Sequence, residues 1–324
     1  MTQYLDFEKP IKLIEEQIEE LSAKAESSGA AAMSTQLTKL KQNAERLLAD
    51  IYARLDPWQK TQVARHLERP HFKDYIAALV TDFIELSGDR KYAEDAAIVG
   101  GMGRFMGRPC IVIGHEKGRT TQERIKHNFG MSRPEGYRKA IRLMDMAERF
   151  RLPVVTLVDT PGAYPGLGAE ERGGAEAIAR ATERCLTLGV PMVAVIVGEG
   201  GSGGAIAIAS ANTVLMLEHA VYSVITPEGA ASILFRDAGR AKDAAAAMKI
   251  TAQDCIGFKV VDGIVKEPVG GAHRAPEKAV AAVGAAVAKA LDALAGLDAG
   301  ALKAQRRARF LAIGRMEESA APMR

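Results

Sequence analysis

Val193-Ala-Val-Ile-Val-Gly-Glu-Gly-Gly-Ser-Gly-Gly-Ala-Ile-Ala-Ile-Ala209 is the stretch of sequence that decides the fold. It begins as the β-branched apolar run of a buried strand, continues as a glycine-rich loop and ends as a short apolar helix. Glycine lets a ligand contact the main chain, and the first N–H groups of a helix lack intrahelical partners and attract negatively charged oxygen. Because the loop contains no histidine, lysine or cysteine, it predicts backbone donors for an oxyanion rather than a nucleophile or a metal site.

Other interpretations of the glycine loop compete with this one. The loop satisfies the dinucleotide-binding pattern G-x-G-x-x-G, and Glu218 lies where a ribose-binding acid is expected. However, the loop has glycines that this pattern does not require, and the helix after it is short. Ser202 is a weak candidate nucleophile, because no base is identified and no strand is expected directly before it. A glycine turn with a purely structural role remains open.

Composition indicates an ordinary soluble protein. The 324 residues are 48% hydrophobic and carry a formal net charge of +3, and no apolar run approaches the roughly 20 residues that span a bilayer. The start of the chain lacks the apolar segment of a signal peptide. The cysteines are far apart, which favours buried reduced thiols over disulfides or a zinc site. We therefore expect a cytoplasmic protein that binds no membrane and no nucleic acid and holds no structural metal.

Helical periodicity dominates the N-terminal region. Apolar residues recur at helical spacing over residues 11–21 and 37–55, with a break at 27–30, which predicts a charged αα-hairpin. A further helical block is expected over residues 59–86. We assign residues 1–95 to this helical region.

Strands and helices alternate from about residue 96, which predicts an α/β fold with a largely parallel, covered sheet. The first two strands are joined by the hairpin signal Met106-Gly-Arg-Pro. The expected strands are 98–105, 110–114, 154–158, 190–197, 214–217 and 222–225, and the expected helices of the core are 134–150, 170–188 and 203–210. We assign residues 96–276 to this core. Alanine-rich helices at 279–294 and 301–311 form a C-terminal region, 277–324.

A second irregular loop, Asp159-Thr-Pro-Gly-Ala-Tyr-Pro-Gly-Leu-Gly168, follows the strand at 154–158. It leaves the carboxyl end of a parallel strand, where α/β sheets bind ligands, and the glycine loop leaves the next strand. N–H groups at Gly162 and Ala163 are therefore expected near that loop. There they would converge with those of Gly203 and Gly204 as an oxyanion hole, worth about 3–4 kcal/mol per donor in one protease. For Asp159 itself we favour an Asx cap of its own turn over a general base.

A long basic segment lies between the predicted hairpin and the helix at 134–150. Residues 116–133 contain five lysines and arginines and two glutamates. Lys117 and Arg119 are candidates for contacts with coenzyme A phosphates or with an acidic partner. A solvated surface loop is an equally good interpretation.

Eight motifs occur in order along the chain. They are Gly114-His-Glu-Lys-Gly-Arg119, Asn128-Phe-Gly-Met131, Pro134-Glu-Gly-Tyr-Arg-Lys139, Asp159-Thr-Pro-Gly-Ala-Tyr-Pro-Gly166, Ala169-Glu-Glu-Arg-Gly173, Gly198-Glu-Gly-Gly-Ser-Gly-Gly204, Tyr222-Ser-Val-Ile-Thr-Pro-Glu-Gly229 and Gly270-Gly-Ala-His-Arg274. Together they strongly resemble the α-subunit family of bacterial acetyl-coenzyme A carboxylase carboxyltransferases. The resemblance is densest over residues 96–276 and extends to the helical N-terminus and the length.

The resemblance implies a crotonase-like (ClpP/crotonase) core, in which ββα units form a superhelical spiral. It implies an active site shared with a zinc-ribbon β subunit in an α2β2 assembly, working with the biotin carboxyl carrier protein and biotin carboxylase. The reaction would move a carboxyl group from carboxybiotin on the carrier to acetyl-coenzyme A, giving malonyl-coenzyme A, the first committed step of fatty-acid biosynthesis. No cofactor would be bound permanently by this chain, and zinc would lie only in the β subunit.

This reaction needs positioned donors more than a side-chain base, because the biotin anion can itself take the methyl proton of the thioester. We therefore expect the N–H groups of Gly203 and Gly204 to bind the ureido oxygen, supported by Gly162 and Ala163. Further contacts on the carboxybiotin side are expected from Gly200, Gly201, Ser202, Tyr164 and Pro165.

Two other classes of function remain open. A stand-alone crotonase-type acyl-coenzyme A enzyme would need acid or base carboxylates, for which Glu170 and Glu171 are candidates, although solvated residues at a helix start explain them as well. A non-catalytic binding subunit would use the helical hairpin and the basic loop to recruit partners.

Overall fold

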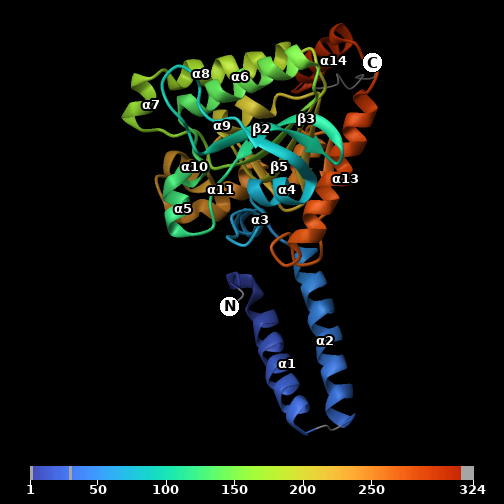
Figure 1. Ribbon diagram of the computed structural model, residues 1–324. Coiled ribbons are helices and arrows are strands. Elements are labelled where there is room, and N and C mark those ends of the chain that lie inside the picture. The colour runs from blue at the N-terminus through green and yellow to red at the C-terminus, as the bar shows by residue number, and fades with distance from the viewer. Residues whose placement is uncertain (1–2, 29–30, 315–324) are drawn as a thin grey trace, which may run out of the picture.

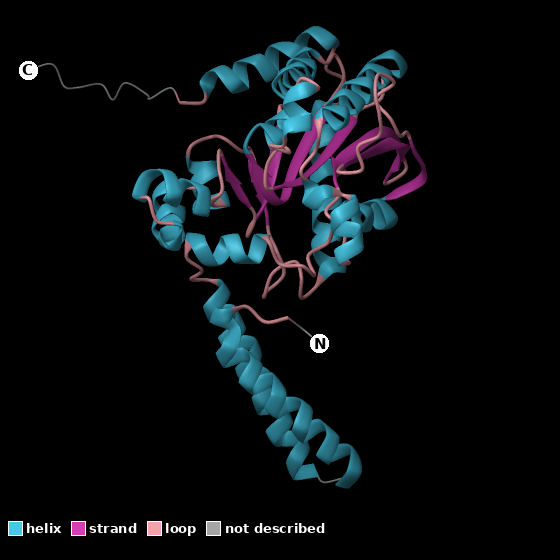
Figure 2. Cartoon of the chain, turned by 90° about the vertical axis from the view of Figure 1, so that its left-hand side faces the viewer, coloured by secondary structure: helices cyan, strands magenta, loops and turns pink. Residues whose placement is uncertain are grey.

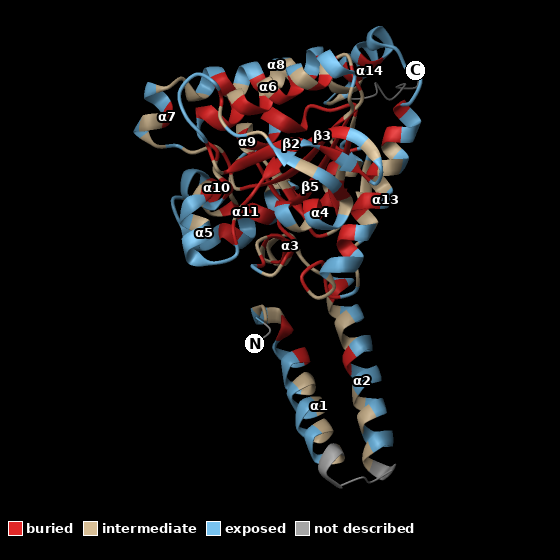
Figure 3. Ribbon diagram, in the orientation of Figure 1, coloured by how far each residue is buried: buried red, intermediate tan, exposed pale blue. Residues whose placement is uncertain are grey.

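An α/β body and a helical hairpin that projects from it make up the structure, a computed structural model that describes residues 3–28 and 31–314 (Figure 1). After the 3-10 turn η1 (Asp6–Glu8), the hairpin consists of α1 (Lys9–Ser28) and α2 (Ala31–Tyr52). Its buried residues lie mainly near its base, and Ile11 is fully buried (Figure 3). The αα-hairpin predicted from periodicity is confirmed, while residues 29 and 30 of its predicted turn lie outside the described residues.

One eight-stranded sheet organises the described part of the body, with the order β1-β2-β3-β4-β5-β6-β8 and with β7 paired to the end of β5. The pairs β1–β2 and β2–β3 are antiparallel and the other strand pairs are parallel, as predicted for most of the sheet. The strands are β1 (Val80–Glu85), β2 (Ile98–Phe105), β3 (Arg108–His115), β4 (Val154–Thr160), β5 (Met192–Gly201), β6 (Thr213–Leu217), β7 (Val221–Ser223) and β8 (Gly263–Val265).

Two predictions at the start of the sheet had different outcomes. The hairpin is confirmed: Met106 and Gly107 turn between β2 and β3 with φ of 47° and 85°, as a tight hairpin turn requires. The helical block expected over residues 59–86 is wrong at its end. It contains α3 (Pro57–Ala64) and α4 (Phe72–Leu79), but residues 80–85 form β1, because pairing with the otherwise open edge of β2 outweighs the local pattern.

Helices cover both faces of the sheet (Figure 2). On one face α6 (Pro134–Phe150) contacts β2 and β3, α9 (Ser202–Ala209) contacts β4 and β5, and α8 (Gly174–Thr187) packs on both helices. On the other face α13 (Pro276–Leu294) contacts α4 and β5. The helix predicted over 170–188 is split into α7 (Leu167–Glu171) and α8, because Gly173 between them takes a left-handed φ of 75°.

Smaller helices complete the body. They are α5 (Thr121–Lys126), η2 (Asn128–Gly130), α10 (Pro227–Phe235), η3 (Ala238–Arg240), α11 (Ala241–Met248), α12 (Ala252–Gly257) and α14 (Ala299–Ala312). Within the described ranges no helix alone has the length and apolarity to cross a membrane; α13 and α14 meet that criterion only as a pair bent by 118°.

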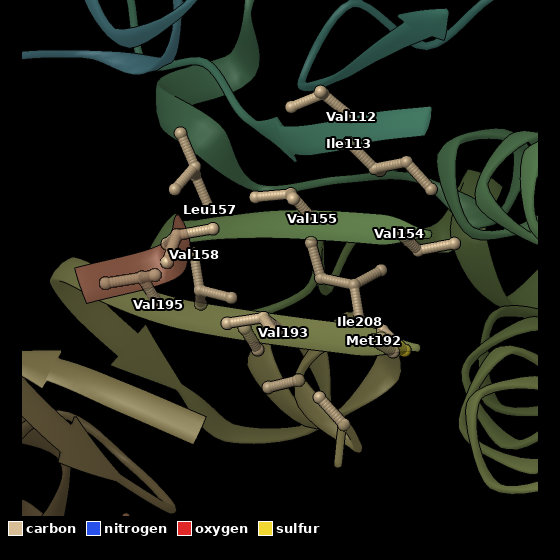
Figure 4. Close-up of a cluster of buried hydrophobic side chains, with 14 of the residues drawn as sticks. Val112, Ile113, Val154, Val155, Leu157, Val158, Met192, Val193, Val195 and Ile208 are labelled. Carbon is tan, nitrogen blue, oxygen red and sulfur yellow. The ribbon is translucent and has the colours of Figure 1, made fainter. Parts of the chain in front are cut away.

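Apolar side chains of β3, β4 and β5 form the centre of the core, where Ile208 of α9 packs against them (Figure 4). Every residue of β4 and β5 is buried. The polar Thr156 among them is satisfied, because its hydroxyl donates to the Ile208 carbonyl oxygen at 2.7 Å. Burial of each Val or Ile contributes about 1.5–3 kcal/mol, so the strand ends from which both predicted loops leave are firmly anchored.

Candidate functional site

The glycine stretch passes directly from strand to helix. β5 extends to Gly201, and α9 begins at Ser202. The expectation that no strand immediately precedes Ser202 is therefore wrong: Gly200 and Gly201 pair with Tyr222 and Ser223 of β7, a long-range partner that extends the strand. Gly201, the residue that caps the helix, has no side chain to accept from the first N–H groups. These groups are consequently available to another acceptor.

The two predicted loops meet backbone to backbone. A Cβ atom added to Gly201 would lie 2.2 Å from the Pro161 carbonyl oxygen, and one added to Gly204 would lie 2.9 Å from the Ala163 nitrogen. Real Cβ atoms do not approach other atoms so closely, so the approach requires glycine at both positions. The convergence that the sequence predicted for the two loops is present in the structure.

The N–H groups in these loops are not equally available. The Gly162 N–H donates to the Thr160 hydroxyl oxygen at 3.1 Å, and that hydroxyl donates to the Gly162 carbonyl oxygen at 2.7 Å. Gly162 is thus committed within its own turn. Among the described residues no acceptor meets the Ala163 N–H. Gly203 and Gly204 are the second and third residues of α9, ahead of its first intrahelical donor.

The residues expected on the carboxybiotin side surround this point of contact. Gly200 faces the ring of Tyr222, because an added Cβ atom would lie 2.7 Å from that ring. The Tyr164 N–H donates to the Ser132 carbonyl oxygen at 3.0 Å, and the guanidinium of Arg133 lies 5.0 Å from its ring centroid. Pro165 is exposed beside it. Their roles in binding stay predictions.

An apolar cavity of about 710 Å³ opens beside the start of α9. Ser202, Gly203 and Ile206 line it, together with residues of β7, α10, α12 and α14. No histidine, aspartate or glutamate is among the described residues that line it; its ionisable side chains are those of Tyr222, Lys249, Cys255 and Arg309. Ser202 therefore has neither an imidazole nor a carboxylate as a general base there. Glu170 and Glu171, the candidate acids of a stand-alone enzyme, are exposed on α7 instead.

An ion-pair network lies on the other side of the Asp159 loop. The Lys117 ammonium lies 2.7 Å from Asp159 Oδ1 and 3.0 Å from Glu199 Oε2. Burial alone would lower the pKa of Lys117, but the charges of both carboxylates outweigh it and raise that pKa. Arg65 contacts the second Glu199 oxygen at 2.7 Å and also pairs with Glu228 at 2.6 Å.

This network changes how two polar residues are interpreted. Asp159 does not cap its own turn within the described hydrogen bonds: its Oδ1 accepts from the Glu199 N–H at 2.9 Å, because β5 runs alongside. Lys117, a candidate for phosphate contacts, uses its ammonium for internal carboxylates. Arg119, the other candidate, is exposed and pairs with Asp74 at 2.6 Å.

Comparison with known proteins identifies the family. Residues 4–314 match the family described as acetyl co-enzyme A carboxylase carboxyltransferase-like. The chain belongs to this family. The acetyl-coenzyme A carboxylase carboxyl transferase subunit alpha of Caulobacter vibrioides strain NA1000 is 65% identical over 312 residues, covering 96% of this chain and 98% of the relative. The subunit of the same name from Methylobacterium nodulans is also 65% identical, over 97% of this chain and 99% of the relative.

Solved structures agree on the fold of this carboxyltransferase-family chain. The transcarboxylase 12S core superposes with a TM-score of 0.58 at 20% identity, covering 72% of this chain and 44% of that one. The β subunit of Pseudomonas aeruginosa geranyl-CoA carboxylase gives 0.55 at 17% identity, covering 76% and 46%. The crotonase-like α/β fold and the family resemblance are therefore confirmed. In the described ranges no group of three or more histidine, cysteine, aspartate or glutamate side chains is placed to hold a metal ion.

Sequence reasoning missed two groups near the site. Thr160, which holds the Gly162 turn, stands inside the quoted loop and could have been found from its hydroxyl at the start of a Pro-Gly turn. Arg65 gave no signal, because it lies in a helical block and its partners Glu199 and Glu228 are more than 130 residues away.

Proposed function

We propose that this chain is the α half of an acetyl-coenzyme A carboxylase carboxyltransferase, which moves the carboxyl group of carboxybiotin to acetyl-coenzyme A and so forms malonyl-coenzyme A. Its partner is a zinc-ribbon β subunit in an α2β2 assembly. Carboxybiotin arrives as a substrate on the biotin carboxyl carrier protein, after carboxylation by biotin carboxylase. The zinc belongs to the β subunit, and the protein works in the cytoplasm.

The observation that carries this proposal is the meeting of Gly204 with Ala163 beside a cavity that no histidine, aspartate or glutamate lines among the described residues. When the carboxyl group leaves biotin, the electron pair of the broken N–C bond stays on the ureido group, and its oxygen becomes negative. We expect the N–H groups of Ala163, Gly203 and Gly204 to stabilise that oxygen, and the close approach of Gly204 to Ala163 supports this. Gly162 supports them through its turn with Thr160 rather than as a donor.

Proton transfer can proceed without a residue from this chain. The ureido nitrogen that loses the carboxyl group takes a proton from the methyl group of acetyl-coenzyme A, and the resulting carbanion attacks the released carbon dioxide. Charge and atoms then balance between the two substrates. This accounts for a cavity that no histidine or carboxylate side chain lines among the described residues, and it disfavours a stand-alone hydratase, which needs protein carboxylates.

The experiment is biotin-dependent decarboxylation of malonyl-coenzyme A, measured with this chain alone and with a co-expressed zinc-ribbon β subunit. We expect acetyl-coenzyme A only from the mixture. Gly204→Val should reduce turnover at least about 100-fold, because its side chain forces the loops apart, while the α–β complex still forms. Gly257→Val is the control, since no atom lies within 4 Å of an added Cβ atom there. Wild-type turnover in Gly204→Val, or no turnover in a stable complex, would contradict the proposal.

A further inference from the structure

Lys117 lies between the two loops that supply the N–H groups, although it contacts neither set of donors. It follows β3, while its partners Asp159 and Glu199 belong to β4 and β5. We propose that Lys117 is a positioning residue that sets the spacing of the two loops, and with it the alignment of the oxyanion donors. The inference rests on the function proposed above for these loops.

The Lys117 ammonium contacts a carboxylate at the end of each of the two strands. One nitrogen bonds Asp159 at 2.7 Å and Glu199 at 3.0 Å, and the Glu199 N–H adds a direct bond to Asp159 at 2.9 Å. The side chains of Asp159 and Glu199 are only 8% and 10% exposed. Ala163 lies four residues after Asp159, and Gly203 lies four residues after Glu199. A change at the ammonium is therefore transmitted to both donor segments over the same short length of chain.

A positive charge is needed at this point because the two carboxylates face each other. Both contact one nitrogen, so without it two negative groups remain close together and largely buried, where repulsion is poorly screened. Arg65, which directly follows α3, neutralises Glu199, but in the described ion pairs it does not reach Asp159. Lys117 is thus the cation that the two strand ends share. Its loss should push the Asp159 loop away from β5.

Backbone packing offers a competing explanation of the same spacing. Gly201 already lies against Pro161, and Gly198 lies against the Asp159 carboxylate, where an added Cβ atom would be 2.4 Å from Oδ1. If this contact alone fixed the loops, removing the ammonium would change stability but not the chemical step. The two explanations therefore differ in what they predict for kcat.

The test uses the α–β complex and the malonyl-coenzyme A decarboxylation assay. Lys117→Met should lower kcat about 100-fold, the cost of displacing catalytic groups by about 1 Å, with KM for malonyl-coenzyme A unchanged because a positioning residue acts on the chemical step. Lys303→Met is the matched control: Lys303 is also paired with a glutamate, Glu148 at 4.0 Å, but it is 47% exposed on α14. A Lys117→Met complex with wild-type kcat, or with a raised KM alone, would overturn the proposal.

A second variant separates positioning from folding. Glu199→Gln keeps the shape of the side chain and weakens the shared ion pair from one side, so kcat should fall about tenfold, as loss of a charge-assisted hydrogen bond predicts. The double variant Lys117→Met/Glu199→Gln should be no slower than Lys117→Met, because the repulsion is gone. Simple multiplication of the two losses would overturn the proposal, as would wild-type kcat in Glu199→Gln if Lys117→Met does not assemble. An inactive wild-type complex would instead reject the proposed function.

Discussion

Two buried histidines, His115 and His273, make the stability of this protein depend on pH in a way that can be worked out. His115 ends β3, and neither of its ring nitrogens has a hydrogen-bond partner among the described residues. Burial, helped by the charge of Lys117, lowers its pKa from 6.5 to about 3. His273 stacks on His66 with ring centroids 3.9 Å apart, and burial and the neighbouring charges lower its pKa to about 2.

The sign and size of the effect follow from these pKa values. In the unfolded chain both rings take up a proton below pH 6.5, whereas in the folded protein they stay neutral until pH 3 or lower. Their contribution to stability is therefore complete above pH 6.5 and declines as the pH falls, by about 1.4 kcal/mol per unit and per ring. Between pH 7 and 5.5, protonation of the two rings in the unfolded chain should lower the free energy of unfolding by about 2–3 kcal/mol in total.

Urea unfolding followed by circular dichroism at pH 7 and 5.5 measures this loss together with the losses from His71 and His219, whose pKa values burial also lowers. His115→Leu removes one of the two rings. Between pH 7 and 5.5 the variant should therefore lose about 1.2 kcal/mol less of its free energy of unfolding than the wild type. Carboxylates with lowered pKa values, such as Glu267 with a pKa of about 2, lose their contribution only at lower pH and do not obscure the comparison. Equal losses in the variant and the wild type would refute the reasoning.

Two further predictions concern buried contacts that hold the sheet. Arg69→Met should lower the free energy of unfolding by about 3–5 kcal/mol, because it leaves Glu267, whose side chain is fully buried and bonded by Arg69 at 2.8 Å, without its cation; a loss below 1 kcal/mol in urea unfolding would contradict this. Gly101→Ala should lower the melting temperature and weaken the β1–β2 pair, because its Cβ atom would lie 2.1 Å from the Ile84 carbonyl oxygen. Calorimetry beside Gly257→Ala, where the space is open, checks this, and equal melting temperatures would count against it.

The elements of the fold could be predicted from the sequence wherever the local pattern and the tertiary environment favour the same structure. β4 and the apolar part of β5 are buried on both faces, so each reads as a continuous apolar run. The turn at Met106 and Gly107 was predictable because Gly107 suits positive φ and the apolar runs of two strands flank it. The meeting of the two loops was also predictable, since both leave the same edge of a parallel sheet.

Long-range pairing explains what the sequence did not reveal. β1 is mostly exposed and its two less exposed residues, Val80 and Phe83, are three apart, a spacing that resembles a helix, and only β2 makes it a strand. The last residues of β5 are glycines with little preference for a strand, and β7 holds them in one. The sequence did not reveal that Lys117 is paired inside the protein, because its partners lie 42 and 82 residues further along the chain.

The pairing of β5 with β7 has a consequence for the order in which the protein is built. Gly200 and Gly201 reach their final conformation only when residues 221–223 arrive beside them and Pro161 packs from the other side. Contacts between distant parts of a chain form late, because the intervening chain must first lose its freedom. During synthesis the N–H groups of the two loops therefore cannot come together until most of the sheet has emerged. A nascent or truncated chain consequently lacks the arrangement of N–H donors that the proposed active site requires.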